Sequence, residues 1–361
     1  MIGQIHARAY RQLQVRKDSG LPEFEFALYV RPAHRVNPAL IEELGSPPVR
    51  VAHERLWAEE LDVLDICTPN ASHALYTEQA CRMGAHVYCE KPLARDLEEA
   101  RRMVEVTARA GVRTHVAFVF RYLPAIRQLI QAVSSGAVGR PLHFRMAMLH
   151  GGYLNPERPL TWRLQKSKSG GGALADLGIH LIDILRASLG EVAWVQGETR
   201  THIVERPLAP GSSERQAVDV DDWALCTLGL QQGAVGTIEV SRVAAGREQA
   251  SMIEIYGERG SLAVDFAKPG EAVLYQTQTG RWMPAEEASN PSLHVGPQLF
   301  REATTFMEAL VAAHVSSIED FLRLVKEGPA SSMDFAWAMK NQAVLEAAYQ
   351  SPVEVGRRIH L

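Results

Sequence analysis

Three ionisable side chains in two parts of the sequence are of types that transfer protons. Lys91 lies in Glu90-Lys91-Pro92, and Asp176 and His180 are four residues apart after three consecutive glycines. On a helix this spacing places Asp176 and His180 on one face. A histidine titrates near neutrality, so His180 is the candidate acid/base, Lys91 can donate a hydrogen bond to a substrate oxygen, and Asp176 can orient the substrate or the imidazole. Such a set suits removal of a hydride and a proton from a carbinol group.

A strand–helix–strand unit between residues 63 and 93 is expected to position Lys91. Its elements are predicted at 63–67, 71–83 and 86–89, and Gly84 ends the helix. Parallel strands end at one sheet edge, where open α/β sheets bind ligands, so Asn70 and Lys91 should lie close together beside a cofactor. The residues of this unit expected at the cofactor are Thr68, Pro69, Asn70, His73, Glu90 and Lys91. A core role would explain His73 equally well.

The N-terminal segment contains only part of a dinucleotide-binding turn. Helical spacing begins at once, and Gly3 stands where the last glycine of G-x-G-x-x-G is expected. The preceding strand would be central in a doubly wound sheet, and its loss would leave two unpaired edges. Either the start was assigned about a dozen residues late or the chain begins here and binds its cofactor poorly, and the first alternative is favoured. Ile2 and Gly3 are expected at the cofactor.

The next predicted strand, 24–30, bears on the choice between NAD and NADP. It ends in Val30 and Arg31, where an NAD-specific domain usually has an acidic residue that binds the ribose hydroxyls. An arginine suits the 2′-phosphate of NADP, so Arg31 is a candidate cofactor ligand and the cofactor is NAD or NADP with a preference for NADP. A solvated loop arginine is an equal alternative.

The remainder of the chain is different in type. Consecutive strands without intervening helices, from about 191 to 279, predict a large antiparallel sheet. A glycine-marked loop, 151–172, contains Trp162 and Arg163, which either fill the core or approach cofactor and substrate. The segment 205–217 is expected to be a mobile loop, and closing helices are expected at 299–313, 317–327 (capped by Ser317) and 332–349. The predicted fold is an α/β Rossmann-type domain lacking its first strand (1–120) followed by an α+β domain with a mostly antiparallel open sheet (121–361).

Composition limits the class of protein. A chain of 361 residues suits two domains, because single cores stop growing near roughly 250–300 residues. The net charge of −4 argues against nucleic-acid and membrane-surface partners, and no apolar run approaches a membrane span. The four cysteines lack C-x-x-C spacing and no signal peptide is expected, which favours a cytoplasmic protein with reduced thiols. No metal is expected, since Asp176 and His180 have no third ligand at helical spacing.

Four motifs together resemble the glucose-fructose oxidoreductase / inositol dehydrogenase / rhizopine catabolism (Gfo/Idh/MocA) family. They are VLDICTPNASH, GAHVYCEKPLA, WR followed by GGGALADLGIHLID, and GERGSL at 257–262. The resemblance covers nearly the whole chain and implies a two-domain NAD(H)- or NADP(H)-dependent oxidoreductase acting on sugars or polyols. It assigns the catalytic roles to Lys91, Asp176 and His180, and implies a homodimer or homotetramer packed through the open sheet face. Val30 and the absent first strand depart from the family pattern.

Two other functions remain open from the sequence. A non-catalytic nucleotide or sugar sensor occurs in this family, but it has no need of a proton relay such as Lys91, Asp176 and His180. NAD-dependent, redox-neutral glycoside hydrolysis would use the same cofactor, with the hydride taken and then returned. The substrate itself cannot be read from one sequence.

Overall fold

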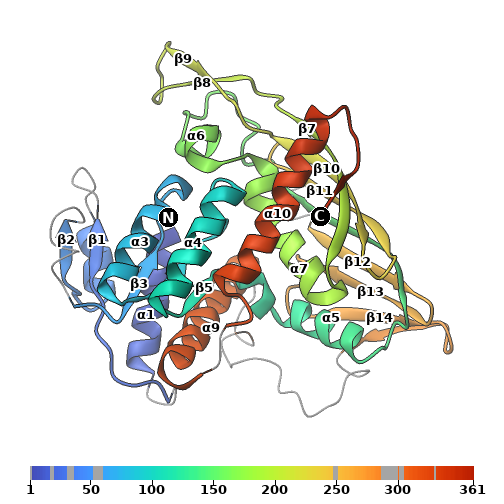
Figure 1. The fold of residues 1–361 in the computed structure, drawn as a ribbon, viewed down its shortest axis with the longest axis horizontal. Helices are drawn as coiled ribbons and strands as arrows, with labels where there is room; N and C mark the ends of the chain where they lie inside the picture. Colours follow the sequence, from blue (N-terminus) through green and yellow to red (C-terminus); the bar gives the residue numbers. More distant parts are fainter. Residues whose placement is uncertain are drawn as a thin grey trace.

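The computed structural model describes residues 2–16, 20–30, 36–51, 60–246, 251–285, 300, 305–328 and 331–361. Its N-terminal part has parallel strands in two sheets, β1-β2 and β3-β4-β5 (Figure 1). The strands are β1 (Leu28–Val30), β2 (Val49–Val51), β3 (Val63–Ile66), β4 (His86–Cys89) and β5 (Thr114–Val116), and the helices are α1 (Ile2–Val15), α2 (Pro38–Glu43), α3 (His73–Met83) and α4 (Leu97–Ala110). No strand among the described residues joins the two sheets. This is the arrangement that the sequence predicts for a Rossmann-type domain lacking its first strand.

The predicted strand–helix–strand unit is confirmed. β3 and β4 pair in parallel, with Val63 opposite His86, and a short 3-10 turn (Asn70–Ser72) leads into α3. Gly84 ends α3 in the left-handed conformation at φ 71°, which glycine adopts without steric cost. The residues that follow β3 and β4 therefore lie at the same edge of the sheet.

The C-terminal part is built on a nine-stranded sheet of order β15-β14-β13-β12-β6-β11-β10-β7-β16. Its strands are β6 (Pro141–Leu149), β7 (Val192–Arg200), β10 (Trp223–Leu230), β11 (Val235–Ser241), β12 (Met252–Gly257), β13 (Gly260–Asp265), β14 (Ala272–Gln276), β15 (Arg281–Pro284) and β16 (Ile359–His360). Only β6 and β11 pair in parallel, and every other neighbouring pair is antiparallel. The predicted mostly antiparallel sheet is confirmed.

Helices cover one face of this sheet (Figure 1). α5 (Pro124–Ser134) contacts β13 and β14, α7 (Ile179–Leu189) contacts β6, and α10 (Phe335–Val353) contacts β7. Buried and partly exposed residues alternate along β10 and β12, as expected for strands with one covered face. Apolar side chains also remain exposed on this sheet, among them Leu142 and Val235.

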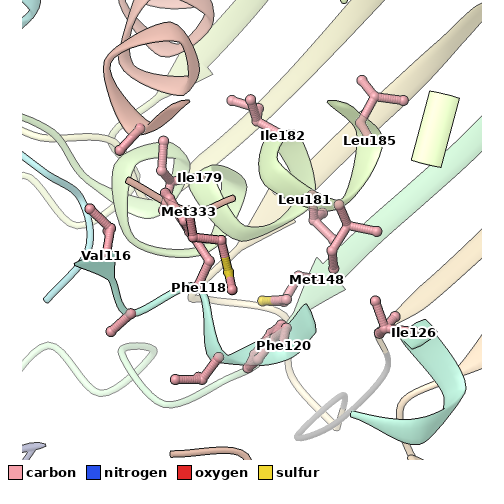
Figure 2. Packing of buried hydrophobic residues seen from close by; sticks show 14 of the residues in the cluster. Val116, Phe118, Phe120, Ile126, Met148, Ile179, Leu181, Ile182, Leu185 and Met333 are labelled. Atoms are coloured by element: carbon pink, nitrogen blue, oxygen red, sulfur yellow. The ribbon is translucent and has the colours of Figure 1, made fainter. Parts of the chain in front are cut away.

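The core runs without a break between the two parts (Figure 2). Val116 and Phe118 lie two residues apart at the end of the first part, and they belong to the same buried cluster as Ile179 of α7 and Met148 of β6. Burial of these apolar side chains fixes α7 against the end of the Rossmann-type domain. Consequently the helix that follows Asp176 has a set position relative to Lys91.

Two predictions about secondary structure are wrong. The helices expected at 299–313 and 317–327 are, over the described residues, one helix, α9 (Phe306–Glu327), which packs on α1. Ser317 is not a cap but a buried residue of α9, bonded to Tyr88 Oη at 2.7 Å and His115 Nε2 at 3.2 Å. The expected mobile loop at 205–217 contains an antiparallel hairpin of β8 (Glu205–Pro207) and β9 (Arg215–Ala217). Arg206 of this hairpin is fully buried and donates a hydrogen bond to the carbonyl oxygen of Tyr153.

Candidate functional site

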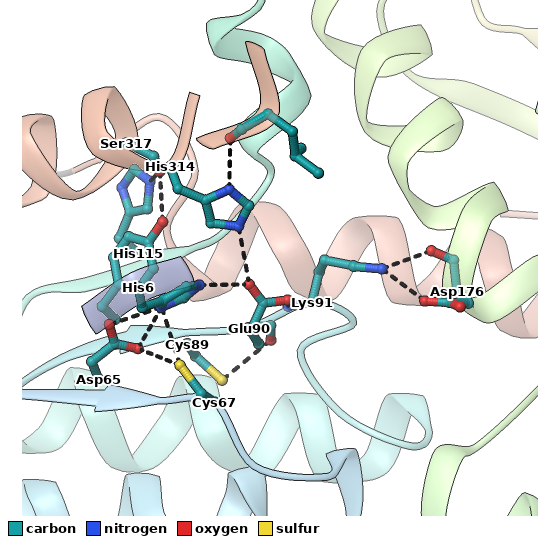
Figure 3. Close-up of polar contacts among 12 residues, drawn as sticks. His6, Asp65, Cys67, Cys89, Glu90, Lys91, His115, Asp176, His314 and Ser317 are labelled. Carbon is teal, nitrogen blue, oxygen red and sulfur yellow. Dashed lines mark hydrogen bonds and ion pairs between the residues drawn. The ribbon is translucent and has the colours of Figure 1, made fainter. Parts of the chain in front are cut away.

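Lys91 and Asp176 meet although they are 85 residues apart in the chain (Figure 3). The ammonium nitrogen of Lys91 lies 2.9 Å from Oδ1 of Asp176 and 2.8 Å from the Asp176 carbonyl oxygen. Lys91 follows β4, whereas Asp176 lies before α7 in the second part of the chain. This contact places the two predicted catalytic groups on facing sides of one site.

Cations surround the Asp176 carboxylate. Besides Lys91, the guanidinium of Arg242 donates to Asp176 Oδ2 at 3.4 Å and to the carbonyl oxygen of Gly172 at 2.8 Å. Burial raises the pKa of Asp176, but the charges of Lys91, Arg242 and Arg163 outweigh burial and hold that pKa far below its usual value. Asp176 is therefore ionised at every physiological pH.

His180 is a buried imidazole in the first turn of α7. Its ring stacks on Phe120, with centroids 4.2 Å apart, and only 6 % of the residue is exposed. Its Nδ1 has no hydrogen-bond partner among the described residues. Burial, followed by the charge of Lys91, lowers the pKa of His180 well below its usual value, so the ring is neutral and can accept a proton.

The backbone between Asp176 and His180 differs from the regular helix that the sequence predicts. Leu174–Gly178 forms a π-helical turn that continues into α7. Gly172 approaches the backbone of Asp221 so closely that a Cβ would lie 2.0 Å from its carbonyl oxygen, and Asp221 accepts hydrogen bonds from the backbone of Gly172 and Leu174. The glycine-rich segment thus fixes the start of this turn, a kind of helix irregularity that is frequent at functional sites.

The residues expected at the cofactor from the first turn and from β3 lie at the same sheet edge. Gly3, in the first turn of α1, has its Cα beside Cys67, where an added Cβ would come within 3.4 Å of the Cys67 Cβ. Ile2, Thr68 and Pro69 are partly exposed. Asn70 is buried and donates from Nδ2 to the carbonyl oxygen of Ser169 at 2.7 Å.

His73 and Glu90 are buried, and their polar atoms face other groups of the protein. His73 is fully buried, and its ring nitrogens face the carbonyl oxygens of Thr68, Pro92 and Leu93 at 3.0–3.2 Å. Glu90 is 7 % exposed and its carboxylate faces His6. Both residues support the turn that carries Lys91, and their direct contact with a cofactor remains a prediction.

The remaining residues predicted to contact the cofactor are Trp162, Arg163 and Arg31. Trp162 and Arg163 lie in a 3-10 turn, Trp162–Leu164, with the guanidinium of Arg163 4.4 Å from the Trp162 ring centroid. Arg163 is close enough to Asp176 to lower the pKa of that carboxyl. Arg31 falls outside the described residues. The prediction that Arg163 approaches the site thus has structural support, whereas a role for Arg31 remains a prediction.

Asp183, whose sequence position suits either a pocket residue or a surface carboxylate, is neither. It is 1 % exposed and accepts hydrogen bonds from Arg121, from the indole of Trp337 and from Asn341. A buried carboxylate with this set of donors is structural.

Arg242 and His6 are site residues that the sequence patterns did not identify. Arg242 ends a strand-like stretch of alternating apolar and polar residues, an unusual position for a fully buried charge. The sequence leaves the role of His6 undecided. Two sets of side chains in the described part of the chain also lie close enough to ligate a metal ion, namely His6, Asp65 and Cys67, and His6, Glu90 and His314.

Comparison with protein families agrees with this geometry. Residues 1–118 match the model described as the oxidoreductase family with an NAD-binding Rossmann fold, and residues 126–263 match the GFO/IDH/MocA C-terminal domain. The chain belongs to the Gfo/Idh/MocA oxidoreductase family. None of the helices in its described residues has the length and hydropathy needed to cross a membrane.

Similar proteins include two sugar or polyol dehydrogenases. Levoglucosan dehydrogenase of Pseudarthrobacter phenanthrenivorans is 31 % identical over 98 % of this chain and 95 % of its own length. Myo-inositol 2-dehydrogenase of Thermotoga maritima is 27 % identical over 76 % of this chain and 73 % of its own length. Among solved structures, levoglucosan dehydrogenase in complex with NADH and levoglucosan superimposes with a TM-score of 0.83 at 29 % identity, covering 100 % of this chain and 96 % of that one.

Proposed function

We propose that this member of the family transfers a hydride between a nicotinamide cofactor and a carbinol carbon of a sugar or polyol, with Lys91, Asp176 and His180 as its catalytic residues. The observation that carries the proposal is the 2.9 Å contact between Lys91 and Asp176, with the neutral imidazole of His180 on the helix that follows. The similarity to levoglucosan and myo-inositol dehydrogenases supports the substrate class.

The residues at the sheet edge fit a dinucleotide. α1 begins beside the carboxyl end of β3, the position in which a helix N-terminus accommodates a pyrophosphate. Gly3 packs against Cys67, so the first turn of the helix lies close to the end of the strand. Ile2, Gly3, Thr68, Pro69 and Asn70 would hold the cofactor, with Trp162 and Arg163 approaching from the second domain.

The catalytic residues divide the proton chemistry among them. A bound nicotinamide supplies the carbon that accepts or returns the hydride. During oxidation the hydroxyl proton passes to the neutral imidazole of His180, while the Lys91 ammonium donates a hydrogen bond to the same substrate oxygen. Asp176 holds the Lys91 ammonium in place. In the reverse direction protonated His180 returns the proton to the alkoxide oxygen.

Four finer points are part of the proposal. Arg31 favours NADP, although the levoglucosan dehydrogenase structure contains NADH. The protein would divide into domains at about residue 120, and it would form a homodimer or homotetramer through the open sheet face, where Leu142 and Val235 are exposed. The fourth point is a cytoplasmic location, which the cysteine usage supports.

The test is a Lys91→Met variant assayed with both nicotinamide cofactors against a panel of aldoses, anhydrosugars and polyols. We expect kcat to fall roughly 10²–10³-fold, the usual cost of removing one hydrogen-bond donor to a developing oxyanion, while cofactor still binds by fluorescence titration. Lys168→Met, at an exposed lysine of the same region, is the matched control and should leave kcat unchanged. Wild-type turnover by Lys91→Met would refute the role assignment.

A further inference from the structure

A buried polar cluster lies on the side of Lys91 opposite to Asp176 (Figure 3). We call it the His6 cluster, and it consists of His6 from α1, Asp65 and Cys67 from β3 and its end, Glu90 after β4, and His314 from α9. His6 is 2 % exposed and occupies its centre. None of these side chains donates or accepts a proton in the proposed hydride transfer.

His6 bridges two carboxylates. Its Nδ1 lies 2.9 Å from Asp65 Oδ2, and its Nε2 lies 3.0 Å from Glu90 Oε1. Both ring nitrogens can donate only if the imidazole carries a proton on each. Burial pulls the pKa of His6 down, but the charge of Asp65 and its hydrogen bond raise it well above its usual value overall. His6 is therefore a buried cation between the buried carboxylate of Glu90 and the partly exposed carboxylate of Asp65.

Glu90 connects this cation to the proposed catalytic lysine. Burial raises the pKa of Glu90, yet His314, with Nε2 3.9 Å from the carboxylate, and the hydrogen bond from His6 hold it well below its usual value, so the side chain is a carboxylate. Its second oxygen, Oε2, accepts the backbone N–H of Lys91 at 3.2 Å. The Glu90 carboxylate thus fixes the backbone of Lys91. The side chain of Lys91 reaches the Asp176 oxygens at 2.8–2.9 Å.

We propose that His6 is a positioning residue for hydride transfer: held by Asp65, it binds the Glu90 carboxylate and, through Glu90, fixes the backbone of Lys91. This inference rests on the proposed function, because it gives His6 a role only if Lys91 takes part in the reaction. The hydrogen bond between His6 and Glu90 joins the first turns of α1 to the end of β4, although the two segments are far apart in sequence.

The same distances would allow a metal ion. Both nitrogens of His6, however, already face carboxylate oxygens at hydrogen-bond distance, which satisfies a protonated ring completely. Burial and Asp65 raise the pKa of Cys67 to about 12, so its sulfur is a thiol that donates to Asp65 at 3.3 Å. A hydrogen-bonded charge network accounts for every one of these contacts without an ion.

Several titratable groups face His6 and set the pH behaviour of any variant. They are Asp65 and Cys67 at β3, Tyr88 on β4 with its ring 5.6 Å from that of His6, Glu90 after β4, and His314 on α9 with its ring 5.1 Å away. Replacing His6 by a neutral residue removes one of the two groups, His6 and His314, that hold the pKa of Glu90 down. The pKa of Glu90 must then rise, and Glu90 becomes protonated at a higher pH than in the wild type.

The experiment compares His6→Gln, Glu90→Gln and the double variant in the complete chain. We expect His6→Gln to lower kcat roughly ten- to a hundredfold, as for a misplaced catalytic group, with a smaller change in the KM for the sugar. Its kcat should acquire a new acid limb, falling as the pH decreases. The double variant should lose that limb, because the amide that replaces the Glu90 carboxylate does not titrate, and should lose no more kcat than the worse single variant.

Controls separate this role from simple stabilisation. His115→Gln removes another fully buried histidine on the neighbouring strand, one that bonds Ser317 and Ser331, and it should lower the melting temperature without altering the kcat–pH profile. A His6→Gln protein that is less stable but has wild-type kcat and pH profile would overturn the inference. Stoichiometric metal in the purified wild type that is lost from His6→Gln would overturn it as well. Normal turnover by Lys91→Met would instead overturn the proposed function, whatever His6→Gln does.

Discussion

Asp176→Asn isolates the charge of the carboxylate at the centre of the site. The carbonyl oxygen of asparagine can still accept the hydrogen bond from Lys91, but the negative charge that faces Lys91, Arg242 and Arg163 is gone. Lys91 and Asp176 are 16 % and 27 % exposed, so water screens this pair only partly. A hydrogen bond to a charged group contributes about 1.5–3 kcal/mol.

If that contribution is needed to hold Lys91 at the substrate oxygen, kcat/KM should fall about ten- to a hundredfold, since each 1.36 kcal/mol is about a factor of ten. Asp176→Ala, which removes the acceptor as well, should lose more. Steady-state kinetics on the preferred sugar measures both values. Glu258→Gln removes a carboxylate from an exposed pair with Arg140 and is the control. An Asp176→Asn enzyme within about twofold of wild type would contradict the electrostatic argument.

Two further predictions concern the pH profile and the backbone of the site. Because burial and Lys91 lower the pKa of His180, its imidazole stays neutral as the pH falls through 6.5, so kcat/KM for oxidation should remain flat there and decline only at lower pH. A wild-type acid limb centred near 6.5 would contradict this. Gly172→Ala should reduce the free energy of unfolding by about 1–3 kcal/mol, because the added Cβ meets the Asp221 backbone at 2.0 Å. Gly270→Ala, with no atom within 4 Å, is the control, and equal urea midpoints for the two variants would refute the packing argument.

Sequence patterns predicted helices and strands correctly where residues close in the sequence were sufficient to specify them. The unit containing β3, α3 and β4 was found because apolar runs, helical spacing and a terminal glycine all agree over a short stretch. The break at Ser317 was wrong because serine is also a common buried polar residue, and here Tyr88 and His115 from distant strands bond it. The hairpin at Glu205–Pro207 and Arg215–Ala217 was missed because its stability comes from burying Arg206 against another loop.

The sequence by itself determined which groups could do the chemistry and which sheet edge carries Lys91, since strand ends and residue types are local properties. It also indicated the family. Only the tertiary structure decided three contacts. Asp176 bonds Lys91, Arg242 donates to Asp176, and His6 bridges Asp65 and Glu90. These contacts join segments that are tens of residues apart, and the pKa values depend on burial and on charges from several elements at once. No spacing rule contains that information, because it arises only when the helices and sheets pack.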